Sequence, residues 1–308
     1  MKALVKSQGE NATVQRVLDP AIQQNDDVIV KVAVAGLCRT DVYVALEQVP
    51  AANRIILGHE FSGTVVEIGN GVTDLPRGAR VAVMPIFQKH TLANLHPIPH
   101  DLFTSYDMFG VHLDGCFAEY IRVPRRAIRE IPEAMTFHIA AYAEPVAASL
   151  AVLQADIHPQ QRGVIFGKNR IAELTKRVLH CFGFDQIEMV DEPELIDASP
   201  SSFDFAIETG ISQESFSAIL NLLRPKGMLI VKSRQHQAIR VRLLELLDKE
   251  IRLQALAYGS FEQALEILSS GELSVEDLIG KQHSLEGLAK ELPHSLHSEL
   301  AKPFVILS

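Results

Sequence analysis

Cysteine is scarce in this chain, which excludes a framework of disulfide bonds. Only Cys38, Cys116 and Cys181 occur in 308 residues, and they lie far apart in the sequence. Small extracellular domains that depend on disulfides carry many more cysteines at regular spacings. We therefore expect a protein of a reducing compartment, the cytoplasm.

Long apolar runs and blocks of basic residues are also missing. No stretch reaches the 18 or so apolar residues that a membrane span requires, and the polar residues after position 6 do not form the core of a signal peptide. The net charge is −9, with acidic and basic residues interspersed. This pattern argues against a nucleic-acid partner and against a membrane-surface role.

The chain has the composition of a globular protein, and its length favours two domains. Hydrophobic residues make up 47% of it and charged residues 22%, and 308 residues exceed one ordinary core. The first eighty or so residues read as short strands with glycine turns, for example 28–35 and 61–68, which suggests a small barrel. Further along, residues 115–121 read as a strand and residues 137–153 as a helix. From residue 163 short apolar strands alternate with amphipathic helices, with a turn expected at 225–227, which predicts a parallel sheet and an α/β class overall.

Two short stretches near the start carry residues that suit a zinc ion. Residues 36–41 read Gly-Leu-Cys-Arg-Thr-Asp, and residues 58–60 read Gly-His-Glu. A thiolate donor, an imidazole and two carboxylates in one small region are typical zinc chemistry. Glu144, far along the chain, could add another carboxylate. By itself each residue has a simpler reading: Cys38 as a small buried apolar group, Thr40 as a helix cap and Glu144 as a brace near a hinge.

The turn after the strand at 164–166 resembles a dinucleotide-binding turn with one departure. The usual pattern is G-x-G-x-x-G/A, in which the second glycine lets the backbone approach the pyrophosphate. Here the three positions are Gly167, Asn169 and Ala172. Asn tolerates left-handed backbone better than most residues, but its side chain should hinder the ligand.

Asp191 strengthens the nucleotide interpretation, and the residues after it weaken it. Asp191 ends the second strand, where an acidic residue would bind the ribose hydroxyls of NAD and repel the extra phosphate of NADP; otherwise it is simply a polar strand end. Residues 192–202 then lead to the next strand at 203–207. A parallel crossover needs about a dozen residues, so we expect the sheet to lack its third strand, which usually walls the adenine end.

Taken in order, these segments resemble the medium-chain zinc-dependent alcohol dehydrogenases, especially the sorbitol, threonine and butanediol dehydrogenases. The resemblance rests on 38–41, 58–63, 115–120, 144–145, 203–210, 223–227 and 261–265. It implies a GroES-like barrel as the catalytic domain over 1–150 and 260–308, interrupted by a shortened Rossmann domain over 151–259.

The resemblance also implies roles for individual residues. Cys38 and His59 would bind the catalytic zinc, and Glu60 would bind it or exchange with water or substrate. Glu144 matches the third ligand of the polyol-type members. Thr40 matches a proton relay, Asp41 an acid that orients His59, and Arg39 a contact to the cofactor pyrophosphate.

The segment 85–110 departs from many members of that family, which hold a structural zinc there with four cysteines. It contains no cysteine, so we expect one catalytic zinc and no structural zinc. His90, His96 and His100 could form a substitute metal site, but their spacing favours solvated loop histidines.

These features together predict an enzyme that oxidises a secondary alcohol, of the polyol or amino-alcohol type, to a ketone with transfer of hydride to NAD. The resemblance implies a homodimer or homotetramer that acts on a small molecule. Two alternatives stay open: a zinc-binding pseudoenzyme or scaffold that has lost the cofactor, and a lyase that uses zinc as a Lewis acid.

Overall fold

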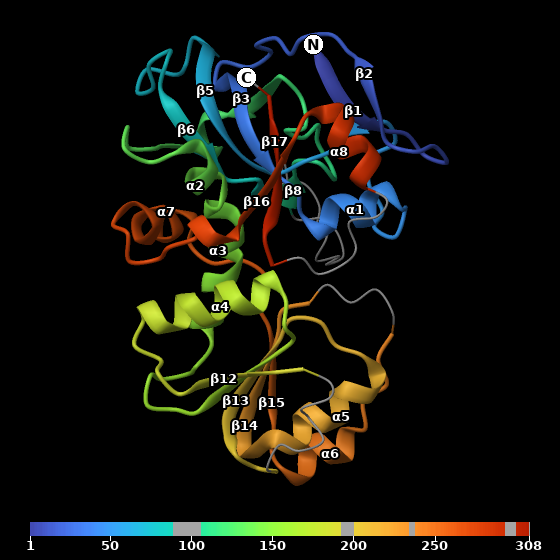
Figure 1. Cartoon of the computed structure of the whole chain (residues 1–308), viewed down its shortest axis with the longest axis vertical. Coiled ribbons are helices and arrows are strands. Elements are labelled where there is room, and N and C mark those ends of the chain that lie inside the picture. Colours follow the sequence, from blue (N-terminus) through green and yellow to red (C-terminus); the bar gives the residue numbers. More distant parts are fainter. Residues whose placement is uncertain (89–105, 192–199, 234–237, 293–299, 308) are drawn as a thin grey trace, which may run out of the picture. The chain divides into compact units, whose positions relative to one another are not determined.

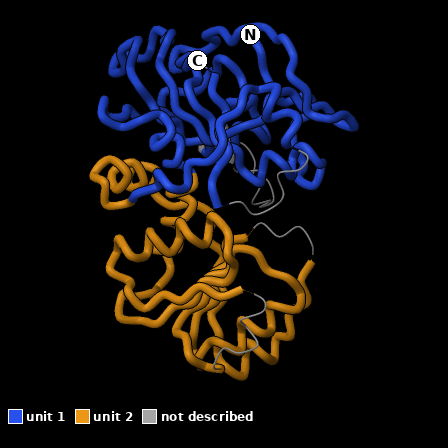
Figure 2. The backbone as a smooth tube through the Cα atoms, viewed as in Figure 1, with its two compact units in different colours: residues 1–144, 274–308 blue, residues 145–273 orange. Residues whose placement is uncertain are grey.

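The computed structural model describes residues 1–88, 106–191, 200–233, 238–292 and 300–307 (Figure 1). The chain forms two compact units (Figure 2). Residues 1–144 and 274–308 make the first unit, and residues 145–273 make the second. No helix in the described ranges is long and apolar enough to cross a membrane.

The first unit is built of antiparallel strands around the ten-residue strand β3 (Asp27–Gly36). Strand β5 (Glu60–Ile68) pairs with one edge of β3; on the other edge β9 (Tyr120–Pro124) pairs with its beginning and β17 (Lys302–Ile306) with its end. A strand from the end of the described chain therefore joins the sheet that β3 centres, and β16 (Ile279–His283) extends that sheet beyond β17. The other elements of this unit are β1 (Lys2–Lys6), β2 (Thr13–Arg16), β4 (Ile55–Ile56), β6 (Arg80–Val83), β7 (Ile86–Gln88), β8 (Tyr106–Met108), β10 (Ile128–Glu130) and the helices α1 (Arg39–Ala45), α2 (Phe137–Ala141) and α8 (Leu285–Glu291).

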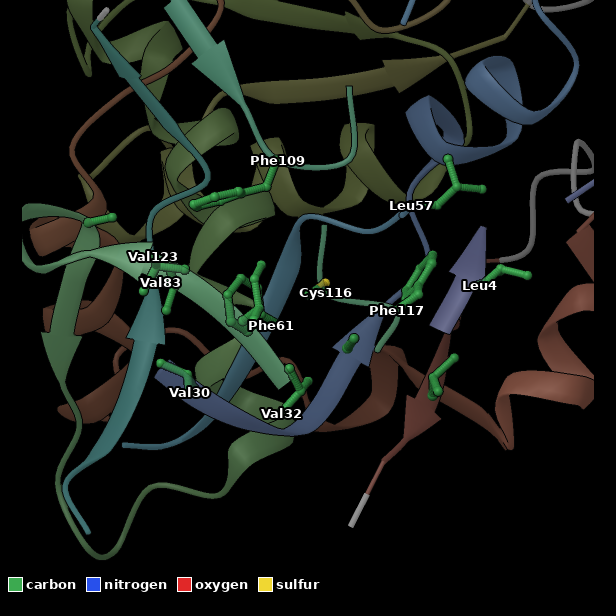
Figure 3. Packing of buried hydrophobic residues seen from close by; sticks show 14 of the residues in the cluster. Leu4, Val30, Val32, Leu57, Phe61, Val83, Phe109, Cys116, Phe117 and Val123 are labelled. Atoms are coloured by element: carbon green, nitrogen blue, oxygen red, sulfur yellow. The ribbon is translucent and has the colours of Figure 1, made fainter. Parts of the chain in front are cut away.

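The core of the first unit lies between these strands. Val30 and Val32 of β3 are fully buried because alternate residues of the strand face the interior. Figure 3 shows Phe61 of β5 near Val83 and Val123, with Cys116 between Phe61 and Phe117. The strand that begins directly after His59 is thus anchored by a large buried side chain.

The second unit is a parallel sheet with strand order β12-β11-β13-β14-β15. Helix α4 packs on one face with Ile165, and helix α5 packs on the other with Val164, because neighbouring strand residues point to opposite faces. This is the doubly wound arrangement that the alternating pattern predicts. Its elements are β11 (Gly163–Phe166), α4 (Arg170–Cys181), β12 (Ile187–Val190), β13 (Phe203–Glu208), α5 (Gln213–Leu222), β14 (Leu223–Val231), α6 (Leu243–Asp248), β15 (Arg252–Ala255) and α7 (Phe261–Ser269).

Strand β12 is the edge of this sheet in the described part of the chain. In the described ranges no strand lies beyond it, as the short connection predicts; residues 192–199 lie outside the described residues. The predicted α/β class, with a barrel-type unit and a shortened parallel sheet, is confirmed.

Three local predictions need correction. The expected strand over 115–121 forms only from Tyr120, because the backbone before it bonds irregularly to residues 56–58. The expected helix over 137–153 is interrupted: α2 ends at Ala141, and α3 (Ala143–Leu150) begins anew with Pro145 in its first turn, where a missing N–H is tolerated. The expected turn at 225–227 lies within β14 as an irregularity at Lys226, whose φ is 64°.

The two units also differ in their bounds from the expected domains. Helix α7 falls in the second unit, although the sequence places residue 260 at the start of the returning segment. Helix α3 spans the boundary, since Glu144 ends one part of the first unit and Pro145 begins the second.

Candidate functional site

The pairing of β3 with β5 brings the two candidate metal-binding stretches together. Gly36, at the end of β3, is the register partner of Glu60, at the start of β5. Because the strands are antiparallel, the residues just after β3 lie beside the residues just before β5. Cys38 and His59 therefore meet although they are far apart in sequence.

Cys38, His59 and Glu60 form a group whose ligand atoms all lie within 4.8 Å of one another. His59 and Glu60 are each 1% exposed. One thiolate, one imidazole and one carboxylate are the donors that a zinc ion accepts, and three protein ligands with an open position are typical of catalytic zinc. The donor set present here therefore fits zinc.

Asp41 organises this group through three accepted hydrogen bonds. Its Oδ2 accepts from Cys38 N at 3.0 Å, and its Oδ1 accepts from Gly58 N at 3.0 Å. Oδ1 also lies 3.1 Å from His59 Nδ1. With Nδ1 bonded to Asp41, Nε2 of the ring is the nitrogen left to ligate, which is how a second carboxylate usually fixes a metal-binding histidine.

The charges around His59 favour its protonated form when no metal is bound. Burial lowers the pKa of His59, but the Asp41 carboxylate and the Cys38 sulfur raise it, and the net result is a pKa well above its usual value. A cation is therefore favoured at this position, and zinc would have to compete with a proton for it.

Gly58 is required where it stands because of its conformation and its surroundings. Its φ is +96°, and a Cβ there would lie 2.8 Å from Cys116 Sγ and 2.8 Å from the Phe117 ring. Cys116 is fully buried, and burial raises the pKa of its thiol well above the usual value. Cys116 is therefore a packing residue that shapes the turn before His59.

Lys302 is a member of the site that the sequence did not reveal. Its ammonium forms an ion pair with Glu60 Oε2 and also donates to Leu37 O at 3.3 Å. Lys302 is 2% exposed and lies 5.8 Å from the ring centroid of Tyr142. Strand β17 pairs with β3, which pairs with β5, and this places Lys302 beside Glu60. Only this long-range pairing could have revealed that Lys302 belongs to the site.

Thr40 and Arg39 begin helix α1, directly after the candidate ligand Cys38. The Thr40 hydroxyl lies 3.7 Å from Cys38 Sγ, and the residue is buried. Arg39 is exposed. The predicted cap at Thr40 or Asp41 is displaced slightly: Cys38 is the N-cap residue, and Asp41 reaches back to its N–H as in a capping box.

Glu144 is buried in helix α3, but the structure does not bring it into the group of three. Among the described residues, the only group of three or more histidine, cysteine or acidic side chains whose ligand atoms all lie within 4.8 Å of one another is Cys38, His59 and Glu60. Glu144 is 7% exposed. Its role as a zinc ligand stays a prediction. His90, His96 and His100 lie outside the described residues.

In the second unit, the glycine-bearing turn joins β11 to α4 as predicted. Gly167 has φ +110°, and a Cβ there would lie 2.6 Å from Thr209 Oγ1. Asn169 is the N-cap residue of α4, and its Oδ1 accepts from Ile171 N at 3.0 Å and Ala172 N at 3.1 Å. Ala172 is fully buried, which explains why a small residue stands there.

Asp191 lies beside this turn. Phe166 and Val190 are register partners in parallel strands, and Gly167 N donates to Val190 O at 2.8 Å. Asp191 follows directly at the carboxyl end of β12, the edge at which open parallel sheets bind nucleotides. The structure therefore brings together Gly167, Asn169, Ala172 and Asp191, as the dinucleotide interpretation requires.

Comparison with known proteins confirms the resemblance to medium-chain zinc-dependent alcohol dehydrogenases. Residues 24–133 match the alcohol dehydrogenase GroES-like domain. Galactitol 1-phosphate 5-dehydrogenase of Escherichia coli K12 is 26% identical over 329 aligned residues, which cover 94% of this chain and 95% of that protein. L-threonine 3-dehydrogenase of Bacillus velezensis is 31% identical over 198 residues, covering 62% of this chain and 57% of that enzyme.

The fold is shared with solved structures over nearly the whole chain. A protein of Sinorhizobium meliloti, named as a zinc-binding dehydrogenase and solved with NADP, has a TM-score of 0.88 at 24% identity. The match covers 99% of this chain and 98% of that one. The relatives named galactitol 1-phosphate 5-dehydrogenase and L-threonine 3-dehydrogenase support an oxidoreductase and do not favour the pseudoenzyme or lyase alternatives.

Proposed function

From this relationship and the geometry of the first unit, we propose a zinc-dependent dehydrogenase that oxidises a secondary alcohol, of the polyol or amino-alcohol type, to a ketone. The observation that carries the proposal is the convergence of Cys38, His59 and Glu60 within 4.8 Å, held by Asp41. The relatives named galactitol 1-phosphate 5-dehydrogenase and L-threonine 3-dehydrogenase support this substrate class.

Cys38 and His59 would hold the zinc, with Glu60 or Glu144 as the third protein ligand. Zinc would supply a Lewis acid that lowers the pKa of a substrate hydroxyl. The Thr40 hydroxyl, which lies 3.7 Å from Cys38 Sγ, would receive the proton that the substrate hydroxyl gives up. Asp41 holds the His59 ring, and Lys302 neutralises Glu60 while that carboxylate does not ligate.

A nicotinamide dinucleotide would be the hydride acceptor, and we propose NAD. Asp191 at the end of β12 supports NAD over NADP, because a carboxylate there repels a ribose phosphate. Among solved proteins of this fold, one was solved with NADP and another with NADH. Gly167, Asn169 and Ala172 would complete this site in a shortened Rossmann domain that interrupts the catalytic domain. Arg39 of the catalytic domain would contact the cofactor pyrophosphate.

We also propose a homodimer or homotetramer in the cytoplasm. Three leucines of α6 are strongly exposed, Leu243 by 75%, Leu244 by 58% and Leu247 by 71%, and the edge strand β15 follows this helix. Exposed apolar side chains that cluster together commonly mark an interface. The free thiols Cys38, Cys116 and Cys181 suit a reducing compartment.

The decisive experiment combines metal analysis with substrate oxidation. We expect one zinc per chain, and for Cys38→Ser a loss of zinc and of at least about a thousandfold in kcat/KM, which follows from removing the metal that stabilises the developing charge. Cys181→Ser, which changes a thiol in the second unit, is the matched control and should keep both.

Substrate comparison tests the second half of the proposal. Vicinal diols and amino alcohols should be oxidised faster than primary apolar alcohols. An enzyme that prefers a primary apolar alcohol would contradict the substrate class, and zinc binding without any NAD reduction would contradict the dehydrogenase.

A further inference from the structure

The start of helix α4 is already bonded to a side chain of its own turn. A helix begins with N–H groups that lack partners within the helix, and these groups with the helix dipole attract the phosphates of a dinucleotide. In this chain Asn169 Oδ1 accepts from two of them, Ile171 N at 3.0 Å and Ala172 N at 3.1 Å. A neutral amide oxygen thus occupies the donors that an anion would use.

A second contact fixes the Asn169 side chain in this position. Its Nδ2 donates to Thr209 Oγ1 at 2.8 Å, and the Thr209 hydroxyl in turn donates to Phe166 O at 2.9 Å. Thr209 is 2% exposed and follows β13 directly. The side chain of Asn169 therefore links the end of β13 to the start of α4, with both its donor and its acceptor in use.

The neighbouring Gly167 keeps the left-handed backbone conformation that favours glycine at such a turn. Its φ is +110°, and a Cβ there would lie 2.9 Å from Asn169 Nδ2 and 2.6 Å from Thr209 Oγ1. The cradle that this glycine leaves open is therefore filled from the side by Asn169. The departure from the usual glycine pattern therefore lies in one side chain.

We propose that Asn169 is an internal competitor of the dinucleotide: it caps α4 in the free protein and must turn away before a pyrophosphate reaches the amides of Ile171 and Ala172. The inference rests on the proposed function, since it takes a dinucleotide as the ligand. It implies that this chain binds the cofactor more weakly than its turn would with glycine at position 169, and that Thr209 sets the strength of the competition.

Fluorescence titration with NADH on the full-length protein tests this, because it measures binding without turnover. Asn169→Gly should bind NADH about tenfold more tightly, since hydrogen bonds to a charged group become available without first breaking two others. Thr209→Val keeps Asn169 but removes its anchor and should tighten binding about threefold. Ser260→Gly removes the cap of α7, whose Oγ accepts from Gln263 N at 3.1 Å, and should leave the affinity unchanged.

Thermal unfolding with and without NADH gives an independent readout. Asn169→Gly should unfold at a slightly lower temperature without ligand, because a cap is lost, and should gain more from NADH than the unchanged protein. Circular dichroism checks that each variant folds. If Asn169→Gly does not fold, the NADH affinity of Thr209→Val tests the proposal by itself.

The outcomes separate the two proposals. Equal NADH affinity in Asn169→Gly and the unchanged protein overturns the competition while the dehydrogenase stands. No binding by any variant at millimolar NADH overturns both. Tighter binding in Asn169→Gly and Thr209→Val, with Ser260→Gly unchanged, supports the competition.

Discussion

The two units share a local arrangement, a strand followed by a glycine and a polar side chain, but the polar side chains bond differently. In each, a buried strand leads into a glycine and a polar side chain follows two residues later: Cys38 after Gly36, which ends β3, and Asn169 after Gly167, which follows β11. In the first unit the side chains turn toward a common point within 4.8 Å of one another. In the second unit the side chain turns back onto its own helix.

This difference shows which hydrogen bonds and ion pairs hold each site in place when no ligand is bound. The metal-binding group holds a half-buried thiol together with a buried imidazole and a buried carboxylate. Asp41 bonds to the imidazole and Lys302 pairs with the carboxylate, so the ligand atoms are held around a common point before any metal binds. The turn at α4 has satisfied its donors internally. The first site is therefore arranged for an external partner, and the second must give up internal bonds to accept one.

The largest effect should come from removing the charge that balances Glu60. In Lys302→Met the Glu60 carboxylate stays buried at 1% exposure without its cation, and breaking a buried pair from one side costs about 3–5 kcal/mol of unfolding free energy. Chemical denaturation of the metal-free protein measures this. Saturating zinc should restore part of the loss if Glu60 can ligate.

An exposed ion pair of the same unit supplies the control for Lys302. Lys2→Met removes the pair with Glu286, whose side chains are 48% and 50% exposed, and should change stability little because water screens the two charges. If Lys302→Met is no more destabilising than Lys2→Met, then the first site does not depend on an internal counter-charge, and the contrast between the units weakens.

A smaller effect is expected from Asp41→Asn, which tests whether the first site is preset for its metal. Asn offers one acceptor oxygen, so an amide N–H₂ would face Cys38 N or Gly58 N, both of which are donors. The loss of such a supporting residue typically lowers zinc affinity about 10- to 100-fold. Competition with a zinc chelator measures the affinity.

Asp27→Asn is matched to Asp41→Asn, because Asp27 is also buried and accepts from two backbone donors, Gln23 N and Gln24 N, both at 2.8 Å. It should lower stability and leave zinc affinity unchanged. Equal zinc affinity in both variants would show that Asp41 acts only on the fold.

The sequence predicted what depends on local signals. Residues 28–35 were predictable as a strand, which corresponds to β3, and the turn at Gly167 was predictable from its glycine pattern. Residue 302 shows the limit: a lysine before Pro303 gives no local sign that it is buried, and only the return of β17 to β3 pairs it with Glu60. The bonds of Asn169 were equally hidden, since a hindering side chain was predictable but its partner Thr209, forty residues on, was not.

Pro145 and Gly115 show why two expected elements failed. The alanine-rich run over 137–153 has helical spacing, but Pro145 lacks the N–H that a continuous helix would need, so α3 starts again near it. Gly115 has strand neighbours in sequence, but a Cβ there would lie 2.1 Å from Gly58 O, so close packing on the turn before His59 replaces regular pairing.

The smallest effect concerns Glu47, which lies just beyond the end of α1, the helix that begins after Cys38. Glu47 Oε1 accepts from Lys6 Nζ at 2.6 Å and from Gly9 N at 2.5 Å, and the hydrogen bond from Lys6 holds the pKa of Glu47 below its usual value. A carboxyl with a lowered pKa in the folded state stabilises the fold above its unfolded pKa, and this stabilisation is lost as the pH falls through the folded pKa. Glu47→Gln should therefore be less stable than the unchanged protein at neutral pH.

The stability difference for Glu47→Gln should shrink as the pH falls below 4.5, the ordinary value for glutamate, because the unchanged protein then loses the same charge. Melting temperatures at several pH values measure it, with zinc affinity at neutral pH as the second readout. We expect zinc affinity to stay unchanged, since Asp41 and the β3–β5 pairing hold the ligands independently of the helix end. If zinc binding weakens as well, the metal-binding group depends on the whole of α1, and Asp41 and the β3–β5 pairing do not suffice to hold the ligands.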